Sequence, residues 1–220
     1  MSETTEPENR QALLTALTTE HFGLAGARSS AVGEIAGRSS LYLSSVASVL
    51  IALGFIGQAS HLGDAFRLFA VAVMPVLFFL GLVTYFRVLE KSIEDLYLAR
   101  AVNRIRQYYL QLAGDEARFF MLSGHDDAAG VFANMAVWSP GLQSFLTSAA
   151  SMIGVVNSVV GGAGVALLLG AGAGLSLAIA GSLGIAIALA LIVLHVAYER
   201  RTFRHTLARA EPMFPTPPSV

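Results

Sequence analysis

Three glycines in an apolar run have the composition of a loop that cradles a phosphate. They are Gly170, Gly172 and Gly174, in the stretch "LLLGAGAGLSLAIAG". A dinucleotide-binding loop needs the pattern G-x-G-x-x-G, followed by an acidic residue about 20 residues later. Position 175 is a leucine, and no Asp or Glu lies between Asp127 and Glu199. The sequence therefore favours a tight turn between two helices over a nucleotide site.

Histidines and carboxylates offer two further candidate sites. His125, Asp126 and Asp127 are potential metal ligands, but adjacent residues rarely converge on one ion without more distant partners, so we expect a solvated loop or a helix start. His195 and Glu199 are four residues apart and lack a further ligand, which favours a structural role. G-x-S-x-G, H-E-x-x-H and Walker motifs are absent. We therefore expect no enzyme, no metal site and no cofactor.

The densest group of polar side chains lies on two segments before and after the first pair of predicted spans, which we call the arms. The candidate binding residues there are Glu20, His21, Arg28, Glu34, Arg38, Arg100, Arg104 and Arg106. Glu34 and Arg38 have the i,i+4 spacing of a helical ion pair. We expect salt bridges between the arms, together with contacts to anionic lipid headgroups. The alternative is a cleft for a small anion or a nucleotide between the arms.

The composition indicates a membrane as the environment of the elements that carry these residues. Of the 220 residues, 55% are hydrophobic and 13% are charged, whereas about 25% of the residues of soluble domains are charged. The net charge of −1 argues against a nucleic-acid partner. No cysteine is present, which excludes disulfides and thiolate metal sites. We therefore expect an all-α integral membrane protein that has the lipid bilayer as a partner.

Three windows without Asp, Glu, Lys or Arg divide the chain. A membrane-spanning helix needs about 20 predominantly apolar residues. The window between Arg38 and Asp64 and the window over residues 68–86 hold one span each, whereas the window over residues 128–198 is long enough for two. The predicted spans are residues 39–58, 68–87, 142–169 and 175–198.

Basic residues predict the orientation of these spans, because Lys and Arg collect in cytoplasmic loops. With four spans and both termini inside the cell, all of the 14 Lys and Arg residues except Arg67 lie on the cytoplasmic side. We therefore expect a multi-pass protein of the cell (inner) membrane with both termini in the cytoplasm.

The first two spans are predicted to extend beyond the bilayer. Helical spacing of apolar residues continues outside both spans, so residues 18–113 are expected to form a helical hairpin with two cytoplasmic arms. Its outer turn lies near "QASHLGD", Gly114 ends its second helix, and Thr18 or Thr19 is the predicted N-cap of its first. Close approach of the arms is expected at Gly23, Ala27, Ser30, Gly33 and Gly37.

The remaining segments differ in composition. Residues 1–17 are expected to be disordered. Residues 114–139 are too apolar for a solvated loop, so we expect short helices that lie at the cytoplasmic headgroup level or pack on the arms. Trp138 suits the interface, and Ser139 and Pro140 suit the N-cap and first position of the third span. Residues 140–199 are predicted to form a glycine-rich two-span hairpin. Residues 200–220 are basic and then proline-rich, and this tail is expected to be disordered.

Small residues recur at every fourth position of the fourth span. One ridge is Gly172, Ser176, Ala180, Gly184 and Ala188, and the other is Gly174, Ala178, Ser182, Ala186 and Ala190. Small residues let helix backbones approach closely in a membrane. The expected partner is the third span, through Gly154, Gly161 and Gly164, or another subunit of a homo-oligomer. Asn157 is predicted to form an interhelical hydrogen bond rather than to line a permeation path.

Several segments resemble a family of small bacterial four-span membrane proteins without assigned biochemistry. They are "TEHFGLAGARSSAVGEIAGR", "AVNRIRQYY", "LSGHDDAAGVFANM" and "VVNSVVGG". The resemblance covers most of the chain after residue 18 and implies no activity. The long-armed two-span hairpin is also similar in architecture to SLATT-type membrane effector domains, which are thought to act as pores in nucleotide-triggered defence. No functional residue is carried over from either resemblance.

Two functions fit these features. The first is a non-enzymatic scaffold or sensor whose arms bind a cytoplasmic protein or a small anionic ligand. The second is a passive pore or membrane-effector oligomer lined by serines and small residues. A small proton-coupled transporter fits less well, because apart from Arg87 at the inner end of the second span the predicted spans carry no Asp, Glu, Lys or Arg.

Overall fold

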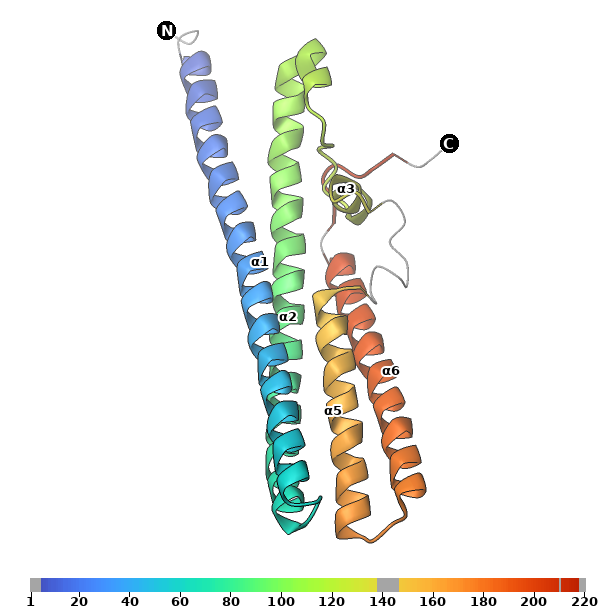
Figure 1. The fold of residues 1–220 in the computed structure, drawn as a ribbon. Helices are drawn as coiled ribbons and strands as arrows, with labels where there is room; N and C mark the ends of the chain where they lie inside the picture. Colours follow the sequence, from blue (N-terminus) through green and yellow to red (C-terminus); the bar gives the residue numbers. More distant parts are fainter. Residues whose placement is uncertain (1–4, 138–146, 210, 218–220) are drawn as a thin grey trace. The chain divides into compact units, whose positions relative to one another are not determined.

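The computed structural model describes residues 5–137, 147–209 and 211–217, and within these ranges the fold is all-helical, as predicted (Figure 1). Four long helices are present: α1 (Thr5–Ala59), α2 (Asp64–Ala113), α5 (Ala149–Gly172) and α6 (Leu177–Arg209). Two short elements follow α2, namely the 3₁₀ helix η1 (Gly114–Phe119) and the helix α3 (Ala128–Asn134).

Each of the four long helices contains a segment that is long and apolar enough to cross a membrane. The sequence-based prediction of four such helices is therefore confirmed. A helix needs about 20 residues to cross the hydrocarbon core, and α5 with 24 residues is the shortest of the four.

Contacts divide the described chain into two units. The first unit comprises residues 5–33, 91–137, 205–209 and 211–217, and the second comprises residues 34–90 and 147–204. The described residues of the four predicted spans belong to the second unit, and much of the charge predicted for the arms belongs to the first. The core of the second unit includes Tyr42, Leu77, Tyr85 and Ile153.

The beginning of α1 differs from the prediction. The helix starts at Thr5, so residues 5–17 are helical rather than disordered. No Gly or Pro lies between residues 8 and 22, and the stretch is rich in Ala, Leu, Glu and Gln, which favour helix. Thr18 and Thr19 are therefore not N-caps. Their hydroxyls donate to the backbone oxygens of Leu14 (2.8 Å) and Thr15 (2.9 Å) inside the helix.

The small residues on the first arm are also placed differently from the prediction. A Cβ atom added at Gly23, Gly33 or Gly37 would have no neighbour within 4 Å. These glycines therefore face open space and do not bring α1 close to α2. Helical periodicity defines a face but not the neighbour that covers it.

The predicted positions of the turns and helix ends agree better with the structure. Residues 60–63 connect α1 and α2 within the predicted outer turn, and Gly114, which follows α2, has a φ of +53°. The turn between α5 and α6 contains Gly174, whose φ of +69° favours glycine. The third predicted span begins with Ser148 as the N-cap of α5. The predicted positions Trp138, Ser139 and Pro140 lie outside the described residues.

Candidate functional site

A buried carboxylate organises the first unit. Asp126 is fully buried, and its Oδ2 lies 2.7 Å from Nη2 of Arg104. It also accepts the backbone N–H groups of Phe214 (2.7 Å) and Met213 (3.1 Å). Nε of Arg100 donates to the backbone oxygen of the same aspartate (2.6 Å). Burial alone would raise the pKa of Asp126, but the Phe214 N–H, Arg104 and the Met213 N–H outweigh it, so the pKa lies below its ordinary value.

The neighbouring carboxylate attaches α3 and the C-terminal tail to each other. Oδ1 of Asp127 caps α3 by accepting the N–H of Gly130 (2.8 Å). The same side chain accepts the backbone N–H (2.9 Å) and the hydroxyl (2.8 Å) of Thr216. Burial opposes ionisation of Asp127, yet the hydrogen bonds from Gly130 and Thr216 bring its pKa below the ordinary value.

These contacts correct two predictions. The tail was expected to be disordered, but residues 211–217 are held by Asp126 and Asp127. The segment at His125 is a helix start, as one alternative proposed, but it is not a solvated loop, because Asp126 is fully buried. Among the described residues, no group of three His, Asp or Glu side chains could hold a metal ion.

A second polar network surrounds Arg106. Its Nη1 donates to Oδ1 of Asn103 (2.7 Å) and to the backbone oxygen of Ser123 (3.4 Å). Nδ2 of Asn134 donates to the same two oxygens, at 3.0 and 2.9 Å. Beside this network is a cavity of about 60 Å³. Its lining residues are Arg28, Ala99, Asn103, Arg106, Leu122, Val131, Asn134 and Met135.

An open apolar groove of about 580 Å³ lies elsewhere in the first unit. It is lined by Leu13, Ala16, Leu17, Glu20 and Leu24 of α1, by Ala101, Arg104, Ile105, Tyr108 and Gln111 of α2, and by Met213 and Phe214 of the tail. The tail thus forms one wall of the groove, and Asp126 and Asp127 fix the tail. Exposed apolar surface of this kind marks interaction sites more often than an isolated exposed side chain does.

The predicted polar residues of the arms do not form one cluster. Arg28 pairs with Asp95, with Nε of the arginine 2.8 Å from Oδ1 of the aspartate. His21 contacts the rings of Phe22 and Tyr109, and Glu20 lines the apolar groove. Arg100, Arg104 and Arg106 belong to the networks described above.

Glu34 and Arg38 belong instead to the second unit. The predicted ion pair between them is confirmed, with Nε of Arg38 2.8 Å from Oε1 of Glu34. The same carboxylate oxygen lies 2.9 Å from Nε of Arg87.

Asn157 forms the predicted interhelical hydrogen bonds in the second unit. With the amide oriented so that each polar atom has a partner, Nδ2 donates to the backbone oxygen of Phe78 (3.0 Å) and to Oη of Tyr42 (3.1 Å), and Oδ1 accepts from the N–H of Leu82 (3.2 Å). A Cβ atom at Gly81 would collide with the Asn157 amide and the Tyr42 hydroxyl. The glycine therefore provides the space in which α1, α2 and α5 share these bonds.

His195 and Glu199 link α6 to α5 and α2. Glu199 is fully buried and accepts the hydroxyls of Ser148 and Ser151, both at 2.7 Å. Nδ1 of His195 lies 2.8 Å from the backbone oxygen of Leu191, and Tyr85 donates to the backbone oxygen of His195 (2.6 Å). These contacts are interhelical or within α6, in agreement with the structural role predicted for this pair.

The first small-residue ridge of α6 packs partly on α5. Gly184 approaches the backbone oxygen of Gly162 and Ala180 is buried, whereas Gly172 and Ser176 are exposed. The glycine of α5 opposite Gly184 is Gly162, which the prediction did not name. Two of the three predicted glycines also meet α6, since Gly154 is near His195 and Gly161 is near Leu191, whereas Gly164 is near Met74 of α2. The second ridge is exposed along its whole length.

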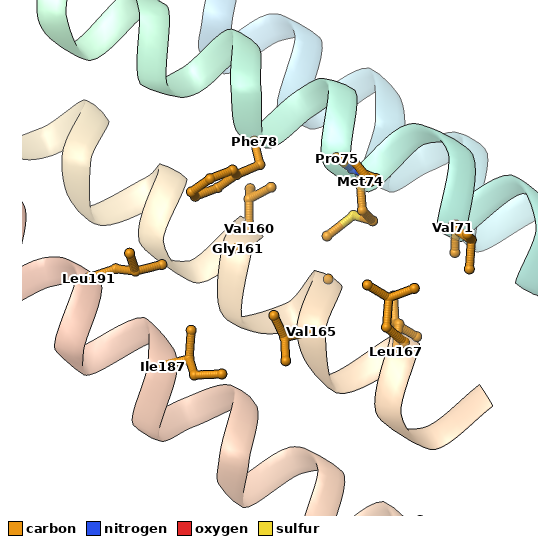
Figure 2. Close-up of a pocket in the computed structure, with 13 residues that line it drawn as sticks. Val71, Met74, Pro75, Phe78, Val160, Gly161, Val165, Leu167, Ile187 and Leu191 are labelled. Atoms are coloured by element: carbon orange, nitrogen blue, oxygen red, sulfur yellow. The ribbon is translucent and has the colours of Figure 1, made fainter. Parts of the chain in front are cut away.

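Figure 2 shows an apolar pocket of about 180 Å³ between α2, α5 and α6. Met74 and Phe78 of α2 and Ile187 and Leu191 of α6 point toward it, and Gly161 leaves space on α5. Every lining residue is apolar. The pocket therefore lacks a polar group that would select a ligand by its chemistry.

The sequence analysis did not predict the hydrogen bonds between residues that lie far apart in the chain. Asn103 and Asn134 lie 31 residues apart, and Asp126 and Phe214 lie 88 residues apart. The spacing from Asp127 to Gly130 is the one local signal, because an Asp before a helical stretch is a common N-cap. No protein-family model, curated protein or solved structure matches the chain. The resemblances drawn from the sequence therefore stay predictions.

Proposed function

We propose that the chain is a non-enzymatic multi-pass protein of the plasma membrane whose first unit lies in the cytoplasm and binds a partner. In this proposal, α1 and α2 form a hairpin that crosses the bilayer through the second unit. Only one basic residue, Arg67, lies in the predicted outer connections, which supports the orientation with both termini in the cytoplasm. The exposed apolar helix surfaces of the second unit support its contact with lipid, since Phe55, Phe79 and Ile185 are each more than 60% exposed.

The observation that carries the proposal is the groove of the first unit. Its lining is largely apolar although the unit is rich in charge, and one of its walls is a tail fixed by two carboxylates. A groove between two helices suits the apolar face of an amphipathic helix, which is a common mode of peptide recognition. Glu20 and Arg104 at the groove can then select partner charges. We therefore propose a helical segment of a cytoplasmic protein as the partner.

Site-specific photo-crosslinking in native membranes tests this proposal. A photoreactive residue at Leu17 lies in the groove, whereas one at Ser29 is exposed on the same helix outside the groove. We expect a discrete protein adduct from position 17, none from position 29, and loss of the adduct when Asp126→Asn and Asp127→Asn release the tail. Identical adducts from both positions, or none from position 17, would contradict the proposal.

An oligomeric pore is the second candidate, and a row of serines favours it. Ser40, Ser44 and Ser48 are exposed at every fourth position of α1 within the second unit. The exposed ridge of α6 from Gly174 to Ala190 would let a second copy pack closely. In liposomes, a pore of this kind should leak small solutes, and Ser44→Leu should reduce the leak. Liposomes that stay sealed with the reconstituted chain would count against it.

A further inference from the structure

The small cavity of the first unit brings two guanidinium groups together without a carboxylate in its lining. Arg28 of α1 and Arg106 of α2 line it, and the other polar lining residues are Asn103 and Asn134. Two like charges beside one enclosed space repel each other unless a counter-charge is present.

Arg106 has no acidic partner within ion-pair distance in the part of the chain that the structure describes. Its Nη1 donates to neutral oxygens of Asn103 and Ser123. Burial lowers the pKa of its guanidinium, and the positive charge of Arg28 lowers it further. The surroundings of Arg106 thus disfavour its charge.

Arg28 is compensated by Asp95. Its Nε and Nη2 donate to the two carboxylate oxygens at 2.8 and 3.2 Å. Two arginines and one aspartate leave a local charge of about +1, which an anion would neutralise. Nη1 of Arg28 and Nε and Nη2 of Arg106 have no hydrogen-bond partner among the described residues. These atoms are donors that a ligand can use.

The two asparagines hold Arg106 in position. Asn103 donates from Nδ2 to the backbone oxygen of His125 (2.8 Å), and Asn134 accepts the N–H of Ser123 at Oδ1 (3.0 Å). Asn134 also donates to Asn103. The polar atoms of both amides are therefore engaged with the protein, and they orient the arginine before any ligand binds. Such preorganisation reduces the entropic cost of binding.

We infer that this cavity binds one small oxyanion of the phosphate or sulfate class, through the free N–H groups of Arg28 and Arg106. A guanidinium presents paired donors that match the oxygens of such anions. The cavity volume of about 60 Å³ is several times the roughly 10–15 Å³ that one water molecule needs on the same measure, which suits a small anion and is too little for a nucleotide. The site shares no lining residue with the apolar groove and does not depend on the proposed partner.

Equilibrium dialysis of the purified full chain in detergent against radiolabelled orthophosphate, at constant ionic strength, tests the inference. We expect one phosphate per chain, competition by sulfate, and a loss of affinity of about tenfold or more in Arg106→Gln. Arg118→Gln is the matched control, because Arg118 is exposed and lies outside the cavity, and it should bind like the unmodified chain. Leu122→Trp fills the cavity from its rim, keeps both arginines and should also weaken binding.

The inference is overturned if the unmodified chain binds no phosphate. It is also overturned if Arg106→Gln and Leu122→Trp, both shown to be helical by circular dichroism, bind phosphate as tightly as Arg118→Gln. If Arg106→Gln does not fold, the Leu122→Trp result decides alone. If the photo-crosslink at Leu17 fails while phosphate still binds, the proposal of a partner in the groove is contradicted and the inference about the cavity is not.

Discussion

The two units hold buried polar groups with different chemistry. In the first unit the buried carboxylate of Asp126 forms an ion pair with Arg104. The same carboxylate also accepts the N–H of Phe214, which lies 88 residues away in the sequence. In the second unit the amide of Asn157 and the hydroxyl of Tyr42 share hydrogen bonds in the space that Gly81 leaves open, and the buried carboxylate of Glu199 accepts two serine hydroxyls. The tail of the first unit is therefore held by carboxylates, whereas the contact of α5 with α6 in the second unit depends on the close approach of backbones.

The largest expected effect is a steric one in the second unit. In Gly184→Leu, the new Cβ would lie 2.6 Å from the backbone oxygen of Gly162, so α5 and α6 must separate. We expect a loss of about 3 kcal/mol, the upper end of the usual range for overpacking, because the obstacle is backbone. Thermal unfolding in detergent measures it. Gly181→Leu is the control, since a Cβ there has no neighbour within 4 Å, and an equal loss in the control would refute the packing argument.

A smaller effect is expected from removing the buried charge of the first unit. Asp126→Ala removes the acceptor of two backbone N–H groups and of Arg104. Hydrogen bonds to charged groups contribute about 1.5–3 kcal/mol each, but the freed donors can reach water, so we expect a loss of about 2 kcal/mol. Hydrogen exchange at the amides of Met213 and Phe214 should become fast. Asp64→Ala, at a fully exposed aspartate, should leave this exchange unchanged, and retained protection in Asp126→Ala would contradict the prediction.

The smallest expected effect is that of low pH on the tail of the first unit. The pKa values of Asp126 and Asp127 are lowered in the folded state, so these carboxylates stabilise the tail above the ordinary aspartate pKa. That stabilisation is lost as pH falls below about 4 and through the lowered values. Spin labels on Gln111→Cys and Glu211→Cys should show one narrow distance at pH 7 and a broad distribution at about pH 3. An unchanged distribution would show that the carboxylates do not hold the tail.

Local patterns in the sequence predicted much of the helical framework. Charge-free windows gave the four apolar helices, the i,i+4 spacing gave the pair of Glu34 and Arg38, and the glycine cluster contained the turn at Gly174. Each of these depends on neighbours within a turn or on the composition of one segment. Their physical cause is therefore contained in the local sequence.

Contacts between distant segments were not predictable in the same way. Periodicity placed Gly23 and Gly33 on one helix, but it could not show that they face open space. The proline-rich tail has the composition of a disordered segment, and only the two acceptors 87–89 residues earlier hold it. The oxyanion cavity likewise depends on Arg28 and Arg106, which the sequence grouped with six other polar residues but did not separate from them.

Cysteine accessibility tests most directly the central claim, that the first unit lies in water and the second in lipid. The chain has no cysteine, so each introduced thiol is unique. Phe22→Cys and Tyr97→Cys in the first unit and Phe79→Cys and Ile185→Cys in the second replace side chains that are 61–71% exposed. In inside-out membrane vesicles, a membrane-impermeant maleimide should label the first pair and not the second until the membrane is dissolved and the protein unfolded. Equal labelling of all four positions, or labelling of the first pair only from the opposite face, would contradict the account.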